Sequence, residues 1–150
     1  MSCILSIMGE NLDIDDFVKK AEMPGFDISY KGDPLGTSAQ RKTKFSGASI
    51  TTSDRDFEDM KGQVEDTIVF LKKYKNNLKI IASIDNIDFA TLDFGIDSNI
   101  DDNKLTQTFY FTKDLIELCA ELHIEIVVSI YKPDMQVILE QRHKGKKSEN

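Results

Sequence analysis

Alternating apolar and polar positions predict a chain of short strands interrupted by helices. Between residues 88 and 96, Ala90, Leu92 and Phe94 alternate with more polar neighbours, which is typical of a strand with one buried face. Similar patterns predict strands at 3–8, 26–30, 45–52, 78–84, 105–111 and 124–131, with a further short edge strand at 137–139.

Three segments carry the helical spacing of three and four residues. The longest runs from residue 53 or 54 to about residue 74. Its apolar stripe consists of Phe57, Met60, Val64, Ile68 and Leu71. A helix at 13–22 is predicted to begin at Asp13, whose carboxylate can accept hydrogen bonds from free backbone N–H groups. A third helix, 113–122, would be capped by Thr112.

The order of these elements predicts the α+β class. We expect a mainly antiparallel sheet of about six or seven strands with three helices packed on one face, because several links are short enough to be hairpins. Residues 31–44 contain Gly, Pro, Ser and Thr and are predicted to form a loop. A single domain should span 1–141, followed by a basic, disordered tail at 142–150.

Composition narrows the class of protein. Hydrophobic residues make up 40% of the 150 residues and charged residues 30%, as in a soluble folded domain. We predict no membrane-spanning segment, since no apolar run approaches the length that a bilayer requires. Two cysteines are too few for a disulfide framework, so a cytoplasmic location is expected. A net charge of −7 argues against a general nucleic-acid binder.

The negative charge is concentrated in one stretch of sequence. Residues 80–103 contain no Lys, Arg or His but hold six aspartates, which leaves a net charge of about −1 for the rest of the chain. If the strands bring them together, their field would attract a basic partner and repel phosphate. A solvated strand face with turn aspartates explains the same residues, and both interpretations stay open here.

Our functional hypothesis is a non-enzymatic domain that binds a basic protein partner. The acidic stretch would steer the partner, and Phe89 or Phe94 would supply an apolar anchor. The predicted partner-binding residues are Asp85, Asp88, Asp93, Asp97, Asp101, Asp102 and Phe89. The alternative is a small-ligand or metal-binding domain, with its site in the loop 31–44 or in the segment 97–103.

The segment 97–103 carries oxygen side chains at alternate positions, as at the start of a calcium loop. These are Asp97, Asn99, Asp101 and Asn103. The segment departs from that loop at Asp102, where glycine is needed, and at Thr108, where a bidentate glutamate is needed. A turn accounts better for the pattern, so we predict no metal and no cofactor.

Other candidates for chemistry have ordinary explanations. No nucleophile elbow or dinucleotide fingerprint is present, and the glycines at 32–36 lack the lysine and spacing of a phosphate loop. Cys119 and His123 stand four residues apart, but they are interpreted as a core residue and a helix-end residue. Glu10 could be tested as a general base, although a surface glutamate beside a helix start is the simpler interpretation.

Several short motifs resemble the bacterial domain-of-unknown-function family 4279. They are Ile7-Met-Gly-Glu10, Leu12-Asp with the following Phe17, Tyr30-Lys-Gly-Asp33, Leu118-Cys-Ala-Glu-Leu122 and Ile130-Tyr131. After Met23 the sequence departs from the family, because the usual Leu-Gly ending of the first helix is absent. The resemblance implies a small cytoplasmic α+β domain and supplies no catalytic residues. It also implies an immunity-type role, in which the domain binds and neutralises a bacterial toxin.

Overall fold

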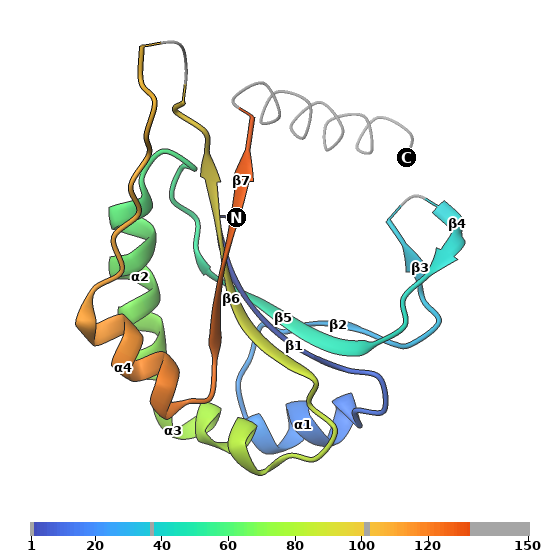
Figure 1. Ribbon diagram of the computed structural model, residues 1–150. Coiled ribbons are helices and arrows are strands. Elements are labelled where there is room, and N and C mark those ends of the chain that lie inside the picture. The colour runs from blue at the N-terminus through green and yellow to red at the C-terminus, as the bar shows by residue number, and fades with distance from the viewer. Residues whose placement is uncertain (1, 37, 101–102, 133–150) are drawn as a thin grey trace.

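The computed structural model describes residues 2–36, 38–100 and 103–132, which form a mixed sheet with helices on one face (Figure 1). The main sheet consists of β1 (Cys3–Gly9), β2 (Asp27–Ser29), β5 (Ser46–Ser53), β6 (Phe89–Asp97) and β7 (Glu125–Tyr131). The helices are α1 (Ile14–Ala21), α2 (Met60–Lys73), α3 (Lys75–Leu78), the 3-10 helix η1 (Lys79–Ser83) and α4 (Lys113–Glu121). The α+β class is therefore confirmed.

The five strands of the main sheet follow the order β2-β5-β1-β6-β7. β1 lies at the centre and pairs antiparallel with both β5 and β6. β7 pairs parallel with β6, so the sheet is mixed, and it has five strands in the described chain where a mainly antiparallel sheet of about six or seven was expected. The chain between these two strands passes through α4, and a parallel pair needs such a crossover because a tight turn can join only antiparallel strands.

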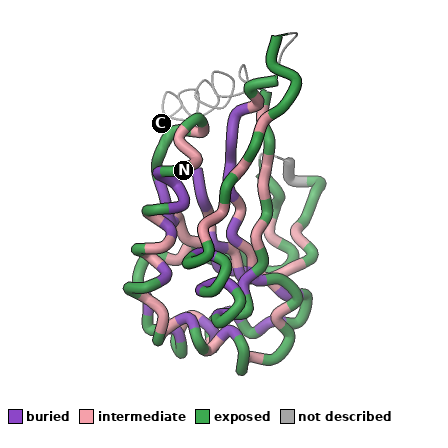
Figure 2. The backbone as a smooth tube through the Cα atoms, turned by 60° about the vertical axis from the view of Figure 1, so that its left-hand side comes forward, coloured by how far each residue is buried: buried purple, intermediate pink, exposed green. Residues whose placement is uncertain are grey.

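One face of the sheet forms the core with the helices. In β1 the buried side chains are those of Cys3, Leu5 and Ile7, and in β6 those of Ala90, Leu92 and Phe94. The helices contribute Phe17 from α1, Val64 and Leu71 from α2, and Leu115 from α4. Figure 2 shows burial concentrated along the central strands and on the helix sides that meet them. This placement confirms the alternation expected of the segment 88–96 as far as Phe94, after which the strand is buried on both faces.

Both helix starts that were predicted from capping residues are confirmed. The Asp13 carboxylate accepts a hydrogen bond from the Asp16 N–H at 3.0 Å, and Thr112 Oγ1 accepts one from the Leu115 N–H at 3.4 Å. The long helix α2 was predicted about six residues too early. It starts at Met60 because Asp59 is its N-cap, while β5 extends the sheet as far as Ser53.

Two predicted strands are wrong. The segment 78–84 is helical, because Leu78 and Ile81 bury one side of a tight turn and the Ile84 N–H donates to the Ile80 carbonyl oxygen. A short apolar run is ambiguous between strand and buried helix, which explains the error. The segment 105–111 joins no sheet, since β7 occupies the place beside β6. Its Phe111 packs on Phe94, with ring centroids 5.4 Å apart.

The predicted loop 31–44 contains a small hairpin. β3 (Pro34–Leu35) pairs with β4 (Ser38–Lys42), and the hairpin projects away from the main sheet (Figure 1). Gly32 and Gly36 have positive φ angles of 95° and 62°, which the turns around this hairpin require. The predicted strand 137–139 and the predicted tail 142–150 lie outside the described residues.

The end of β1 packs tightly against the turn that precedes β6, and Gly9 is the tightest point. The Asp88 N–H donates to the Met8 carbonyl oxygen at 2.9 Å, and the Glu10 N–H donates to Asp88 Oδ2 at 2.7 Å. A Cβ atom on Gly9 would overlap with the backbone oxygen of Asn86. A backbone oxygen held in this turn has little freedom to move away.

We therefore expect Gly9→Ala to lower the free energy of unfolding by about 2 kcal/mol, as overpacking does elsewhere. Urea denaturation followed by circular dichroism measures this change. Ser6→Ala, on the same strand but on the uncovered side of the sheet, is the matched control and should change stability by less than about 0.5 kcal/mol. Equal stability of the two variants would refute the tight contact at Gly9.

Candidate binding surface

The second face of the sheet carries no helix within the described residues (Figure 1). The strand registers place alternate side chains of β5, β1, β6 and β7 on this side. We call it the open face and define it by Ser49, Thr51, Ile4, Ser6, Met8, Phe89, Thr91, Asp93, Glu125, Val127 and Ser129. All of these side chains are exposed or partly exposed. The open face is therefore a continuous surface that side chains of four neighbouring strands build.

Apolar side chains lie at one end and along the middle of the open face. Phe89 is 44% exposed and packs edge-on against Phe45, with centroids 5.6 Å apart. Met8 lies over Gly47, where a Cβ atom would come within 2.7 Å of the Met8 Cγ atom. Val127 of β7 is 40% exposed. The structure thus places the predicted anchor Phe89 on an accessible surface.

Phe94, the other residue suggested as an anchor, is fully buried in the core and is not available to a partner. The two phenylalanines differ because residues 89 and 94 are five positions apart, and an odd separation places side chains on opposite faces of a strand.

The predicted aspartates are distributed along β6 and its flanks. Asp88 precedes the strand and Asp97 ends it, so about 30 Å of extended chain separates them. Asp88 accepts a hydrogen bond from the Glu10 N–H, and Asp85 lines a hollow of about 190 Å³ beside the start of α1. Asp101 and Asp102 lie outside the described residues. The four described aspartates therefore do not converge on one point.

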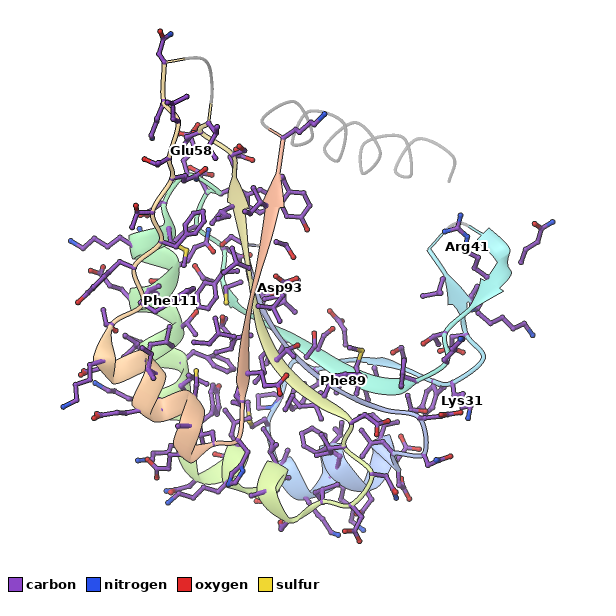
Figure 3. The ribbon with its side chains drawn as sticks, viewed as in Figure 1. Lys31, Arg41, Glu58, Phe89, Asp93 and Phe111 are labelled. Atoms are coloured by element: carbon purple, nitrogen blue, oxygen red, sulfur yellow. The ribbon has the colours of Figure 1, made fainter. Side chains whose placement is uncertain are left out.

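Asp93 is the predicted aspartate that lies in the middle of the open face (Figure 3). Its Oδ2 atom accepts a hydrogen bond from Ser129 Oγ on β7 at 2.9 Å. Its Oδ1 atom is buried and has no hydrogen-bond partner in the described part of the chain. Glu125 pairs with Thr91 and therefore lies diagonally across from Asp93 on the open face, where it is exposed. Sequence reasoning did not find Glu125, because nothing in the sequence shows that β7 lies beside β6.

Charge is divided across the open face. Lys31 and Arg41 lie at the side where the hairpin projects, whereas Asp93 lies on β6 in the middle of the face (Figure 3). Glu125 of β7 adds a second carboxylate near Asp93. The hairpin segment also exposes Lys42 and Lys44. Lys31 forms an ion pair with Glu10 at 3.0 Å, which leaves Glu10 with a structural partner. The surface therefore has a basic side at the hairpin and an acidic side along β6 and β7.

The described residues contain no group of three or more His, Cys, Asp or Glu side chains that could hold a metal ion. His123 and Glu125 line a hollow of about 260 Å³ with Asp88, at the end of the sheet where β6 and β7 begin. Cys119 is buried, and burial raises the pKa of its thiol to about 11, so it is not a nucleophile at neutral pH. The interpretation of Cys119 as a core residue is confirmed.

Asp97 is an unusual carboxylate, since its residue is only 5% exposed and its Oδ1 atom has no hydrogen-bond partner among the described residues. Its backbone is held firmly: the N–H donates to the Phe57 carbonyl oxygen at 3.1 Å, and the carbonyl oxygen accepts from Gln107 Nε2 at 2.8 Å. Burial, and secondarily the charge of Glu58, raise the pKa of Asp97. The charged form of this side chain therefore weakens the fold.

We expect Asp97→Asn to increase the free energy of unfolding at pH 7 by roughly 1 kcal/mol. A carboxyl group with a raised pKa in the folded state destabilises that state above its folded pKa. The gain should thus shrink as the pH falls through the folded pKa of Asp97 and vanish below the unfolded pKa, where both states are protonated. Chemical denaturation at a series of pH values from neutral to acidic, in a buffer that contains a chelator, measures this gain in the free energy of unfolding.

Asp66→Asn is the contrasting control. Arg55 lowers the pKa of Asp66, so loss of the Asp66 carboxylate should lower the free energy of unfolding. A gain for Asp97→Asn that did not change with pH would contradict this account.

No helix among the described residues has the length and apolar character that crossing a membrane requires. Comparison with known proteins adds one partial relative. The small ribosomal subunit protein uS2 of Mycoplasmopsis synoviae (strain 53) is 33% identical over 87 residues. The match covers 57% of this chain and 29% of the ribosomal protein, so the chain spans under a third of that relative. No solved structure matches the chain significantly.

The family comparison covers all of the described residues and confirms the resemblance found in the short motifs. The profile described as "Domain of unknown function (DUF4279)" matches residues 1–133. That span contains every strand and helix described above, from β1 to β7. The chain belongs to the DUF4279 family of domains of unknown function.

Proposed function

We propose that this chain is a non-enzymatic protein-binding domain and that its open face docks a basic protein. The observation that carries the proposal is the face of the main sheet on which no described helix packs and which exposes Phe89 and Val127 among short polar side chains. A sheet of a monomer that meets only water normally carries polar residues on its solvent face. Exposed apolar side chains grouped with polar ones are typical of protein interfaces.

Charge favours a basic partner over an acidic one. The chain has a net charge of −7, and Asp93 and Glu125 lie on the open face beside the apolar side chains. A partner with a basic surface would approach faster at low ionic strength and would meet these two carboxylates on docking. The basic hairpin would then lie at the margin of the interface, where Lys31 is already paired with Glu10.

An immunity-type role fits this chemistry. Toxins that act on nucleic acid carry basic surfaces, and a neutralising partner must present acidic groups and a shape that covers them. We expect the domain to act in the cytoplasm, which fits its two free, buried thiols. The alternative of a small-ligand or metal-binding domain stays a prediction, because no specific contact among the described residues favours it.

The first test asks whether a captured partner uses the open face. The full chain, a Thr91→Arg variant and an Ile116→Arg variant are immobilised and exposed to lysate of the native cell. Thr91 lies in the middle of the open face on β6, whereas Ile116 is 52% exposed on the outer side of α4. We expect one basic protein to bind the wild type and Ile116→Arg, and to lose at least about tenfold in affinity for Thr91→Arg.

The second step uses the purified partner and measures its association rate at low and high salt. Steering by the acidic residues predicts a rate that falls on the order of tenfold as salt is raised. Glu125→Gln should lower the rate at low salt and leave the dissociation rate nearly unchanged. Equal capture by Thr91→Arg and Ile116→Arg, or an association rate independent of salt, would overturn the proposal.

A further inference from the structure

Within the described residues, β7 is an edge strand of the main sheet, and no other strand covers its outer side. The sheet order ends at β7, and within the described residues no further strand pairs with it. Unpaired N–H and C=O groups on such an edge form a template on which another strand can be added. The other edge strand, β2, is only three residues long and offers a much smaller template.

The backbone groups that point outward can be identified from the register. The Tyr131 carbonyl oxygen accepts a hydrogen bond from the Ser98 N–H, so residue 131 directs its backbone groups toward β6. In a parallel pair these directions alternate along the strand, so Val127 and Ser129 also bond β6. The N–H and C=O groups of Ile126, Val128 and Ile130 therefore point away from the sheet.

Between Glu125 at its start and Lys132 just after its end, β7 lacks the features that normally protect an edge. Residues 126–131 contain no charged residue and no proline, and the β6–β7 register has no bulge. Lysines, prolines and bulges are the usual means of keeping edge strands apart. Ile130 is instead 60% exposed and Val127 is 40% exposed. An exposed edge rich in β-branched residues is suited to pairing.

We propose that β7 pairs antiparallel with β7 of a second copy of this chain about a two-fold axis at Val128. In this register Val128 faces its own equivalent, Ile126 lies opposite Ile130 of the other copy, and Val127 lies opposite Ser129 of that copy. None of these pairs carries charge. Glu125 of each copy lies beside the C-terminal end of the other copy's β7, next to the exposed Lys132 of that copy.

Charge therefore favours the antiparallel self-pair. The two Glu125 carboxylates are separated by most of the strand, about 20 Å, so they do not repel one another strongly. A parallel arrangement would instead bring the two Glu125 side chains to the same end. An isologous contact of this kind closes on itself, because each β7 has one edge that no described strand pairs with, and the contact uses both of these edges.

The test compares the oligomeric state of the full chain with that of two variants over a range of micromolar concentrations, by light scattering and sedimentation. Val128→Pro removes an outward N–H and leaves the hydrogen bonds to β6 in place, since an edge strand tolerates proline at such a position. Ile130→Lys places a charge on an exposed edge side chain. We expect a wild-type dimer and a dissociation constant at least tenfold weaker for both variants.

Ile116→Lys, on the exposed side of α4, is the matched control and should dimerise like the wild type. Amide hydrogen exchange gives a second measurement: the N–H groups of Val128 and Ile130 should be protected more strongly at high protein concentration, while those of β2 should not change. If Val128→Pro does not fold, as judged by circular dichroism, Ile130→Lys decides the question. A monomeric wild type, or a dimer that survives both substitutions, would overturn the proposal.

Discussion

One-sided burial of the sheet is the constraint on which the rest of this structure depends. β1 lies at the centre, and its side chains Cys3, Leu5 and Ile7 are fully buried against the helices. All helices of the described chain pack on that face of the sheet (Figure 1). Within the described residues, the opposite face carries no helix, and apart from the stacking of Phe57 on Tyr131 at the end of β7 its side chains are exposed or partly exposed. Its many serines and threonines suit water, whereas Phe89 and Val127 do not.

The fold was predictable from sequence where local chemistry and tertiary packing agree. Asp13 and Thr112 cap helices as expected, since a capping side chain acts on backbone groups only three residues away. The alternation in 88–96 survives because one face of β6 is buried throughout. The strand prediction for the segment 78–84 was wrong because a short apolar run is compatible with either a strand or a tight helix. The sequence did not predict the parallel pairing of β7 with β6, because this pairing depends on a crossover connection that leaves no local sequence pattern.

The candidate surface was less predictable than the fold. Proximity in sequence suggested that the acidic residues would gather, but an extended strand separates its ends and sends alternate side chains to opposite faces. Asp88 became a hydrogen-bond acceptor for the Glu10 N–H, and Asp97 became a buried carboxylate. Of the described aspartates that were predicted to bind a partner, Asp93 is the one among the residues that define the open face. Its neighbour there, Glu125, comes from a strand more than thirty residues later.

Side chains and backbone of β7 offer two separate means of association. Val127 and Ser129 present their side chains to the open face, while the outward backbone groups of the strand lie in the plane of the sheet. Pairing at the edge about a two-fold axis normal to the sheet would leave both open faces uncovered and on the same side. A dimer would then present one surface of twice the width, with acidic strands at its centre and a basic hairpin at each margin. Such a surface could engage a partner with two binding patches, or two partners at once, with an avidity that one copy lacks. Edge pairing and face docking are thus compatible, because they use different atoms of the same strand.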